Sequence, residues 1–138
     1  MLQRIIAAGA VAFGVLVVAQ PAVASAAPVT IPFQVNPAPF GNPNGSINLP
    51  GFRCVAEVGR TRGEVTITGG QRDRWGCIPY ANVHWVNLSN GKTGVANLGA
   101  ALNGQVPHAV LRTGSGQVAL TLLAGGVITP GFATFVVP

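Results

Sequence analysis

Short segments of alternating apolar and polar residues, separated by turn residues, most restrict the fold of this chain. From Gly51 onward these segments are rich in Val, Ile, Leu, Thr and aromatic residues, and Gly, Asn or Pro lies between them. Alternation with a period of two is typical of a β-strand with one buried face, whereas an amphipathic helix needs apolar residues three and four positions apart. The chain contains 19 Gly and 11 Pro among 138 residues, which suits frequent turns. The sequence therefore predicts an all-β fold.

Turn residues between the segments predict where the chain reverses. Three pairs of segments are expected to form hairpins: residues 52–58 with 64–68, 83–88 with 93–96, and 108–112 with 117–123. The first pair flanks an arginine-bearing tip at residues 59–63, and the third brackets the glycine-containing segment 113–116. In the second pair, Asn90-Gly91 supplies the two positive φ angles of a tight type I′ turn. Residues 132–137 are expected as the last strand.

The number and spacing of the segments indicate the architecture. About seven or eight short strands, with turns roughly every 8–12 residues, are typical of a β-sandwich. We therefore expect residues 51–138 to form a single antiparallel β-sandwich, immunoglobulin-like or similar, with a small β-barrel as the alternative. Residues 27–50, rich in Pro and Asn, are expected as an extended lead-in. Within it residues 29–35 alternate, and Pro32 restricts them to an edge strand or an extended arm.

Residues 1–26 have the features of a secretory signal peptide. Arg4 precedes an apolar run at residues 5–19, which is followed by Gln20-Pro21 and by Ala24-Ser25-Ala26. The run of about 15 residues is shorter than the roughly 20 that a membrane-spanning helix needs. We expect a signal helix cleaved near Ala26 and no transmembrane span after cleavage, with an uncleaved anchor as the alternative. The protein is therefore expected to be secreted, extracellular or associated with the cell envelope.

The chain has two cysteines, Cys54 and Cys77. An even number of cysteines in an exported chain favours a disulfide over a metal site or a reactive thiol. A zinc site needs two further ligands, and His84 and His108 lie at no spacing typical of one. We therefore expect a Cys54–Cys77 disulfide, no metal and no cofactor.

Few residues are available for catalysis. Ser115 lies between two glycines, but a nucleophile elbow joins a strand to a helix, and both flanks of Ser115 are strand-like. His84 is next to Trp85 in a predicted strand, so the two side chains point to opposite faces. This predicts that His84 faces the solvent or pairs across strands. Glu57 and Glu64 lie close to arginines in the sequence, so charge pairing explains them better than a pair of glycosidase carboxylates. We expect a protein that is not an enzyme.

An arginine cluster carries most of the positive charge in a chain whose net charge is +5. The cluster with its neighbouring aromatic residues consists of Arg53, Arg60, Arg62, Arg72, Arg74, Trp75 and Tyr80. Guanidinium groups bind planar anions through two hydrogen bonds, and aromatic rings add stacking or sugar contacts. These seven residues are therefore a candidate site for an anionic envelope polymer, a lipid or an acidic protein. A solvated polar face is the alternative, because Glu57, Glu64 and Asp73 are interleaved with the arginines.

A nucleic-acid partner is not expected. The chain is predicted to be exported, and its basic residues lack the density of a groove that follows a phosphate backbone. The oligomeric state is left open by these patterns.

Several features occur together along the whole chain. They are the signal ending Ala24-Ser25-Ala26-Ala27-Pro28, the Pro/Asn-rich lead-in, one cysteine pair, and the strand Trp85-Val86-Asn87-Leu88 leading to Lys92-Thr93-Gly94. In these features the sequence resembles small secreted proteins of mycolic-acid-containing actinobacteria, most of which have no assigned function. The resemblance implies an exported β-rich domain and assigns no functional residue.

Two functions of different classes follow from these observations. The first is a non-catalytic domain that binds a cell-envelope or extracellular partner. The second is a self-associating structural or assembly component, in which copies of the chain cover its apolar strand faces. An enzyme or an inhibitor is the third choice.

Overall fold

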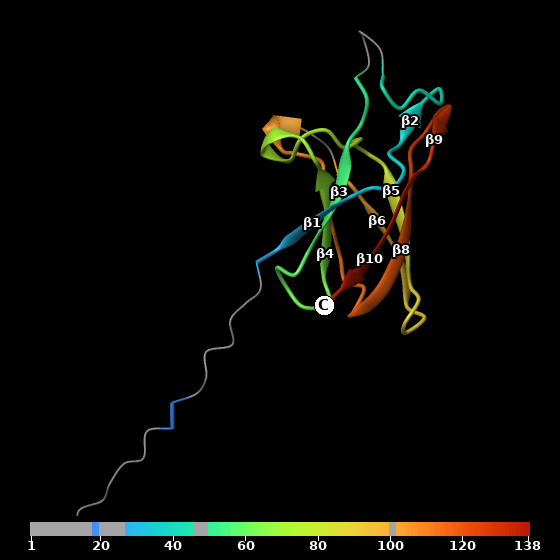
Figure 1. Cartoon of the computed structure of the whole chain (residues 1–138). Coiled ribbons are helices and arrows are strands. Elements are labelled where there is room, and N and C mark those ends of the chain that lie inside the picture. Colours follow the sequence, from blue (N-terminus) through green and yellow to red (C-terminus); the bar gives the residue numbers. More distant parts are fainter. Residues whose placement is uncertain (1–17, 20–26, 46–49, 100–101) are drawn as a thin grey trace, which may run out of the picture.

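The computed structural model describes residues 18–19, 27–45, 50–99 and 102–138 (Figure 1). Apart from Val18 and Ala19, the predicted signal helix lies outside these residues. Within the described part, no helix has the length and apolar character needed to cross a membrane. Strands dominate the structure, with two short 3-10 turns, η1 (Arg72–Arg74) and η2 (Leu102–Gly104).

Two four-stranded antiparallel sheets pack face to face (Figure 1). The first sheet has the order β1 (Val29–Pro32), β3 (Cys54–Val58), β4 (Val65–Gly69) and β7 (Ala109–Leu111). The second has the order β10 (Gly131–Val137), β8 (Gly116–Leu123), β5 (Asn82–Asn87) and β6 (Thr93–Asn97). A third sheet pairs β2 (Ala38–Pro39) with β9 (Ile128–Thr129). The predicted antiparallel β-sandwich is confirmed. Each large sheet ends in edge strands, so the described part is not a closed barrel.

The core lies between the two sheets and follows the alternation of the strands. The first sheet contributes Ala56, Val58, Val65 and Ile67, and the second contributes Val83, Val118, Leu120, Leu122, Ala133 and Phe135, all buried. Burial of each large apolar side chain contributes about 1.5–3 kcal/mol relative to an exposed position. The intervening residues of the same strands face outward, so each sheet also has an outer face.

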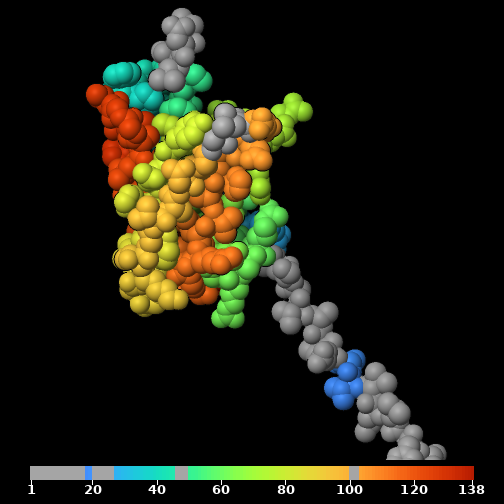
Figure 2. Space-filling model, turned by 180° about the vertical axis from the view of Figure 1, so that it is seen from behind, coloured from blue at the N-terminus to red at the C-terminus, as the bar shows by residue number. Residues whose placement is uncertain are grey.

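Trp85 packs at the edge of the sandwich where the two sheets come together. In the register of the second sheet Trp85 lies opposite Gly94 of β6, and a Cβ on Gly94 would lie 2.5 Å from Trp85 Cζ2. Glycine is therefore the residue that leaves room for the indole. Seen from behind, the yellow residues of β6 lie beside the orange residues of β7 at this edge (Figure 2).

Two of the three predicted hairpins are present. β3 pairs with β4, and Val58 opposite Val65 is the last residue pair before the loop that joins them. β5 pairs with β6. The predicted type I′ turn at Asn90-Gly91 is wrong, because only Gly91 of this pair has a positive φ, at 76°. The loop is longer: the Gly91 N–H donates to the Asn87 carbonyl at 2.8 Å, and the Asn87 N–H donates to the Lys92 carbonyl at 2.7 Å.

The hairpin predicted around residues 113–116 is also wrong. β7 pairs with β4 in the first sheet, whereas β8 pairs with β5 and β10 in the second, so this segment crosses from one sheet to the other. The buried Asn87 holds the crossing: its Nδ2 donates to the carbonyls of Thr113 at 2.9 Å and Ser115 at 3.0 Å. A glycine-containing turn marks a change of direction but does not specify which sheet receives the next strand.

Part of the predicted lead-in belongs to the sandwich. β1 pairs with β3 at the edge of the first sheet, the position expected of a strand that contains Pro32. Phe33 is 5% exposed in the core, and Val35 forms a bridge with Phe132 of β10. The chain thus places three strands in the first sheet before it crosses to the second, whereas an immunoglobulin constant domain crosses after two.

Candidate functional site

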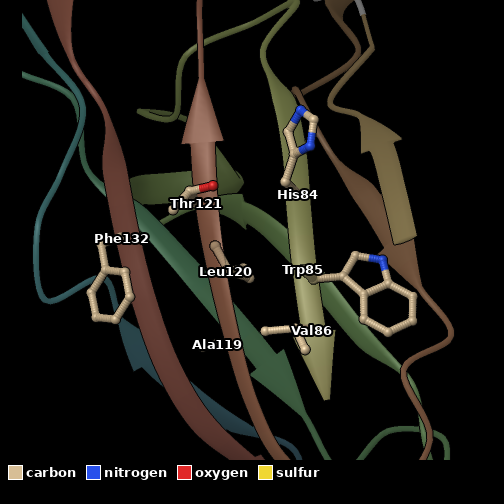
Figure 3. A pocket seen from close by; sticks show the side chains of 7 residues that line it. All are labelled: His84, Trp85, Val86, Ala119, Leu120, Thr121 and Phe132. Carbon is tan, nitrogen blue, oxygen red and sulfur yellow. The ribbon is translucent and has the colours of Figure 1, made fainter. Parts of the chain in front are cut away.

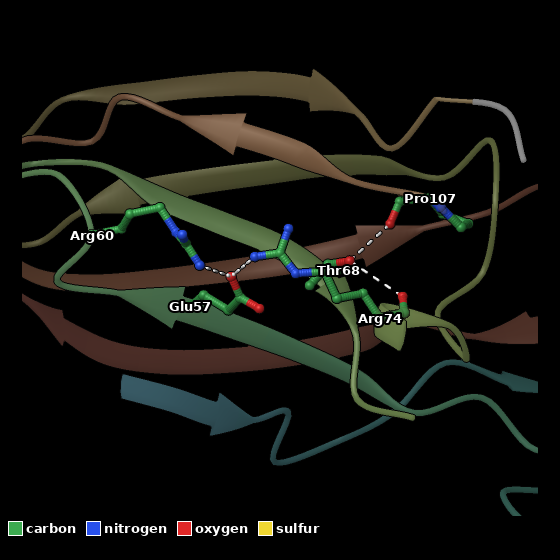
Figure 4. A network of polar contacts seen from close by, with 5 residues as sticks. All are labelled: Glu57, Arg60, Thr68, Arg74 and Pro107. Carbon is green, nitrogen blue, oxygen red and sulfur yellow. Dashed lines mark hydrogen bonds and ion pairs between the residues drawn. The ribbon is translucent and has the colours of Figure 1, made fainter. Parts of the chain in front are cut away.

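The disulfide ties the segment after β4 to the start of β3. Cys54 and Cys77 are joined, with their Cα atoms 4.6 Å apart, as predicted. Between them residues 70–76 fold back against β4, and a Cβ on Gly69 would lie only 2.0 Å from the Trp75 carbonyl oxygen. The Thr68 hydroxyl has one hydrogen to donate and lies between two carbonyl acceptors, 3.2 Å from that of Pro107 and 3.4 Å from that of Arg74 (Figure 4). This packing brings Arg74 onto the outer side of the first sheet.

Arg74 and Arg60 share one carboxylate on that side. The Glu57 side chain, on the outer side of β3, is only 12% exposed and forms ion pairs with both guanidinium groups (Figure 4). The Arg60 Nη2 atom lies 3.6 Å from Glu57 Oε2, and the Arg74 Nη2 atom donates to the same oxygen. The two arginine side chains remain 62% and 43% exposed, respectively. Glu57 therefore positions two guanidinium groups and leaves a net positive charge.

The other predicted arginines do not join this network. Arg72 lies 3.8 Å from Asp73, with both side chains well exposed, and Arg62 is exposed between β3 and β4. Arg53 donates from Nη1 to the carbonyls of Pro43 at 3.2 Å and Phe52 at 2.8 Å. Arg53 also lines a hollow of about 410 Å³ together with Gln34, Asn36 and Thr129. The predicted cluster is therefore spread over separate parts of the structure and does not form one pocket.

The two aromatic residues of the prediction do not share a hollow with the arginines. Trp75 lines an apolar hollow of about 290 Å³ with Phe52, Pro79 and Pro107, and among the described residues no arginine lines it. Tyr80 is 60% exposed and also lies outside that hollow. Tyr80 has a positive φ of 58°, an uncommon backbone conformation for a residue other than glycine.

Arg112 is a residue that the sequence analysis did not include. It follows β7, and its Nε lies 3.4 Å from Glu64 Oε1, just before β4. The pairing of β7 with β4 brings it to the side of the other arginines. No local pattern signals this position, because the neighbourhood depends on a strand pairing between distant parts of the chain.

The second sheet has a different character. Its four strands contain no Asp, Glu, Lys or Arg. On its outer side Phe132, Thr121, His84 and Val95 face one another in register across all four strands. A shallow groove of about 280 Å³ lies there, and Phe132, Ala119 and Val86 also line it (Figure 3). We call the outer side of the first sheet the arginine face, together with the arginines that flank its strands, Arg60, Arg62, Arg72, Arg74 and Arg112. We call the outer side of β10, β8, β5 and β6 the uncharged face.

The residues considered for catalysis are dispersed. His84 is exposed on the uncharged face, on the opposite side of β5 from Trp85. His108 accepts or donates through Nδ1 at 3.2 Å from the Val106 carbonyl, and Ser115 is exposed in the crossing between the sheets. Among residues 27–45, 50–99 and 102–138, no three His, Cys, Asp or Glu side chains are placed to bind a metal ion together.

Comparison with known proteins finds no match to this chain among family models, curated proteins or solved structures.

Proposed function

We propose that this protein is an exported, non-catalytic domain that binds an anionic polymer of the cell envelope or extracellular space through the arginine face. The observation that carries the proposal is the arrangement of Arg60 and Arg74 on Glu57, opposite a sheet whose strands bear no charge. The predicted signal peptide and the Cys54–Cys77 disulfide support export, because disulfides persist mainly in oxidising compartments.

The spread of the arginines favours a polymer over a small anion. An exposed ion pair contributes only about 0–1 kcal/mol, so one contact does not hold a partner. A polymer can contact several arginines at the same time, namely Arg60, Arg62, Arg72 and Arg112. The binding free energies of these contacts would add, because after the first contact has formed each further contact is intramolecular. Phosphate and carboxylate groups suit guanidinium, which offers paired donors to a planar or tetrahedral anion. Binding of this kind weakens as salt concentration rises.

The test is retention of the purified protein on isolated cell-wall material under a rising NaCl gradient. The combined variant Arg60→Gln, Arg62→Gln and Arg72→Gln removes three exposed charges and leaves the Arg74–Glu57 pair in place. We expect it to lose retention about ten-fold, in line with three contacts of roughly 0.5 kcal/mol each.

Two controls distinguish the guanidinium contribution from net charge. The same three positions changed to Lys keep the charge and lose the paired donors, and we expect intermediate retention. Lys92→Gln removes a charge from the loop between β5 and β6, away from the arginine face, and is expected to leave retention unchanged. Equal retention of the parent protein and the triple Gln variant would overturn the proposal.

A further inference from the structure

A polar hollow of about 410 Å³ lies at the end of the sandwich that carries the small third sheet. Its walls come from the lead-in, from the segment before β3 and from β9, and its polar side chains are those of Gln34, Asn36, Arg53 and Thr129. In Figure 1, β2 and β9 mark this end, opposite the C-terminus. None of these four residues belongs to the arginine face, so the hollow is a separate candidate site.

Arg53 is held in the wall of the hollow by one of its terminal nitrogens. Its Nη1 donates to the carbonyls of Phe52 at 2.8 Å and Pro43 at 3.2 Å. A Cβ on Gly51 would lie 2.5 Å from the Pro43 carbonyl oxygen, so glycine at this position lets the two segments approach. The guanidinium group is planar, and its Nε–H and Nη2–H bonds point the same way along another edge. Among the described residues, neither Nε nor Nη2 donates a hydrogen bond.

Two further hydrogen-bond donors line the hollow. Asn36 Oδ1 accepts from the Cys54 N–H at 2.7 Å, which fixes the side-chain amide and leaves its Nδ2 as a donor. Thr129 of β9 adds a hydroxyl. Within residues 27–45, 50–99 and 102–138, neither group has a hydrogen-bond partner. Gln34, by contrast, uses its amide on both backbone groups of Thr134 and forms part of the wall.

No carboxylate of this chain balances the charge of Arg53. The chain contains three acidic residues, and each forms an ion pair with an arginine other than Arg53. The C-terminal Pro138 lies at the other end of the sandwich, where its carbonyl accepts from the Gly63 N–H at 3.0 Å. A hollow with one positive charge, several unused donors and no acidic residue favours an anion from solution.

We propose that the hollow binds the carboxylate of a small organic acid, independently of the polymer binding proposed for the arginine face. The carboxylate lies along the Nε–Nη2 edge of Arg53, and Asn36 Nδ2 and the Thr129 hydroxyl donate to it. Val35 and Pro43 also line the hollow and contact the apolar part of the ligand. A carboxylate is planar and carries a single charge, so it matches one guanidinium group better than a phosphate does.

The test is an NMR titration of the ¹⁵N-labelled, disulfide-bonded protein at constant ionic strength. The probe is N-acetylalanine, which has one carboxylate and a short apolar body, and its neutral amide is the matched control ligand. We expect N-acetylalanine to shift the backbone amide signals of Asn36, Gly41 and Thr129. The expected Kd is about 1–10 mM, because the site is open and the contacts are few. The neutral amide is expected to leave these signals in place.

Variants test which side chains bind the carboxylate. Arg53→Gln removes the charge and the paired donors and is expected to raise the Kd about ten-fold. Arg62→Gln removes the same charge from the exposed loop between β3 and β4, and is expected to leave the Kd unchanged. Thr129→Val keeps the shape of the side chain and loses its hydroxyl, and is expected to raise the Kd about three-fold. Near-UV circular dichroism checks that each variant folds.

Several outcomes overturn the proposal. Equal shifts with N-acetylalanine and its amide do so, as does an equal Kd for the parent protein and Arg53→Gln. If Arg53→Gln does not fold, an equal Kd for the parent protein and Thr129→Val has the same consequence. Tighter binding of inorganic phosphate than of N-acetylalanine also overturns it, because the site then selects a tetrahedral anion.

The titration also separates this proposal from the binding of a polymer. The triple Gln variant of the arginine face keeps every residue of the hollow, so it is expected to bind N-acetylalanine like the parent protein. Loss of binding in that variant would place the carboxylate on the arginine face and overturn the assignment to the hollow. Conversely, Arg53→Gln is expected to retain the salt-sensitive binding to cell-wall material.

Discussion

Removal of the Asn87 side chain is the most direct test of what holds the two sheets in their observed order. Asn87 is fully buried at the end of β5. Its Nδ2 donates to the carbonyls of Thr113 and Ser115, and its Oδ1 accepts from the Ser89 N–H at 2.9 Å. One side chain therefore holds both the crossing between the sheets and the loop between β5 and β6.

The magnitude follows from these three hydrogen bonds of 3.0 Å or less. A net contribution of about 1 kcal/mol for each gives a loss of roughly 3 kcal/mol for Asn87→Ala. In a domain of this size, that loss corresponds to a fall in Tm of roughly 10–15 °C. Asn82→Ala is the matched control on the same strand, because Asn82 is exposed and its side chain accepts one hydrogen bond, from Asn97. We expect that control to lose less than about 1 kcal/mol.

The assay is urea unfolding of the disulfide-bonded protein, followed by tryptophan fluorescence. Equal losses for Asn87→Ala and Asn82→Ala would refute the assigned role of the buried amide. Asn87→Asp adds a second readout, since it keeps the size but directs an oxygen at the carbonyls of Thr113 and Ser115. Those carbonyls raise the pKa of the introduced carboxyl above its unfolded value of about 3.9. The folded state then binds the proton more tightly, so this variant is expected to gain stability as the pH falls from 7 to 4.

Two further predictions concern packing and the disulfide. Gly94→Ala is expected to destabilise the protein by about 1–3 kcal/mol, because its Cβ would overlap the Trp85 ring, whereas Gly125→Ala has open space and should change stability little. Urea unfolding of both variants checks this, and similar stabilities would contradict the packing of Trp85. The double variant Cys54→Ser and Cys77→Ser is expected to lose about 3 kcal/mol of unfolding free energy, because the disulfide closes a loop between cysteines 23 residues apart in the sequence. Thermal unfolding measures that loss, and an unchanged Tm would count against a stabilising disulfide.

Local sequence patterns were sufficient to predict much of the fold. The alternation in residues 54–58 and 65–69 identifies the buried side of each strand, and the glycine-bounded tip between them predicts their pairing. The two cysteines of a chain expected to be exported predict the disulfide. These inferences succeed because strand alternation and turn conformation depend on neighbouring residues.

Local sequence patterns predicted less of the candidate site than of the fold. The arginines from Arg53 to Arg74 stand out by their density, but their partners depend on how the segment after β4 folds back. Glu57 binds Arg60, which is close in sequence, and also Arg74, which reaches it only because residues 70–76 pack over β4. Arg112 joins the same side through the pairing of β7 with β4.

The amino-acid sequence indicates the short strands and the apolar side of each strand, because both depend on the order of neighbouring residues. It also indicates the disulfide, because the chain has two cysteines. The crossing of residues 113–116 from one sheet to the other depends instead on tertiary contacts, since β7 pairs with β4 and β8 pairs with β5, strands that lie far away in the sequence. The same pairings join β3, β4 and β7 in the first sheet, and the arginines lie in the segments that flank these strands, whereas the four strands of the second sheet carry no Asp, Glu, Lys or Arg. Two opposite faces of different character result, and no single segment of the sequence contains that property.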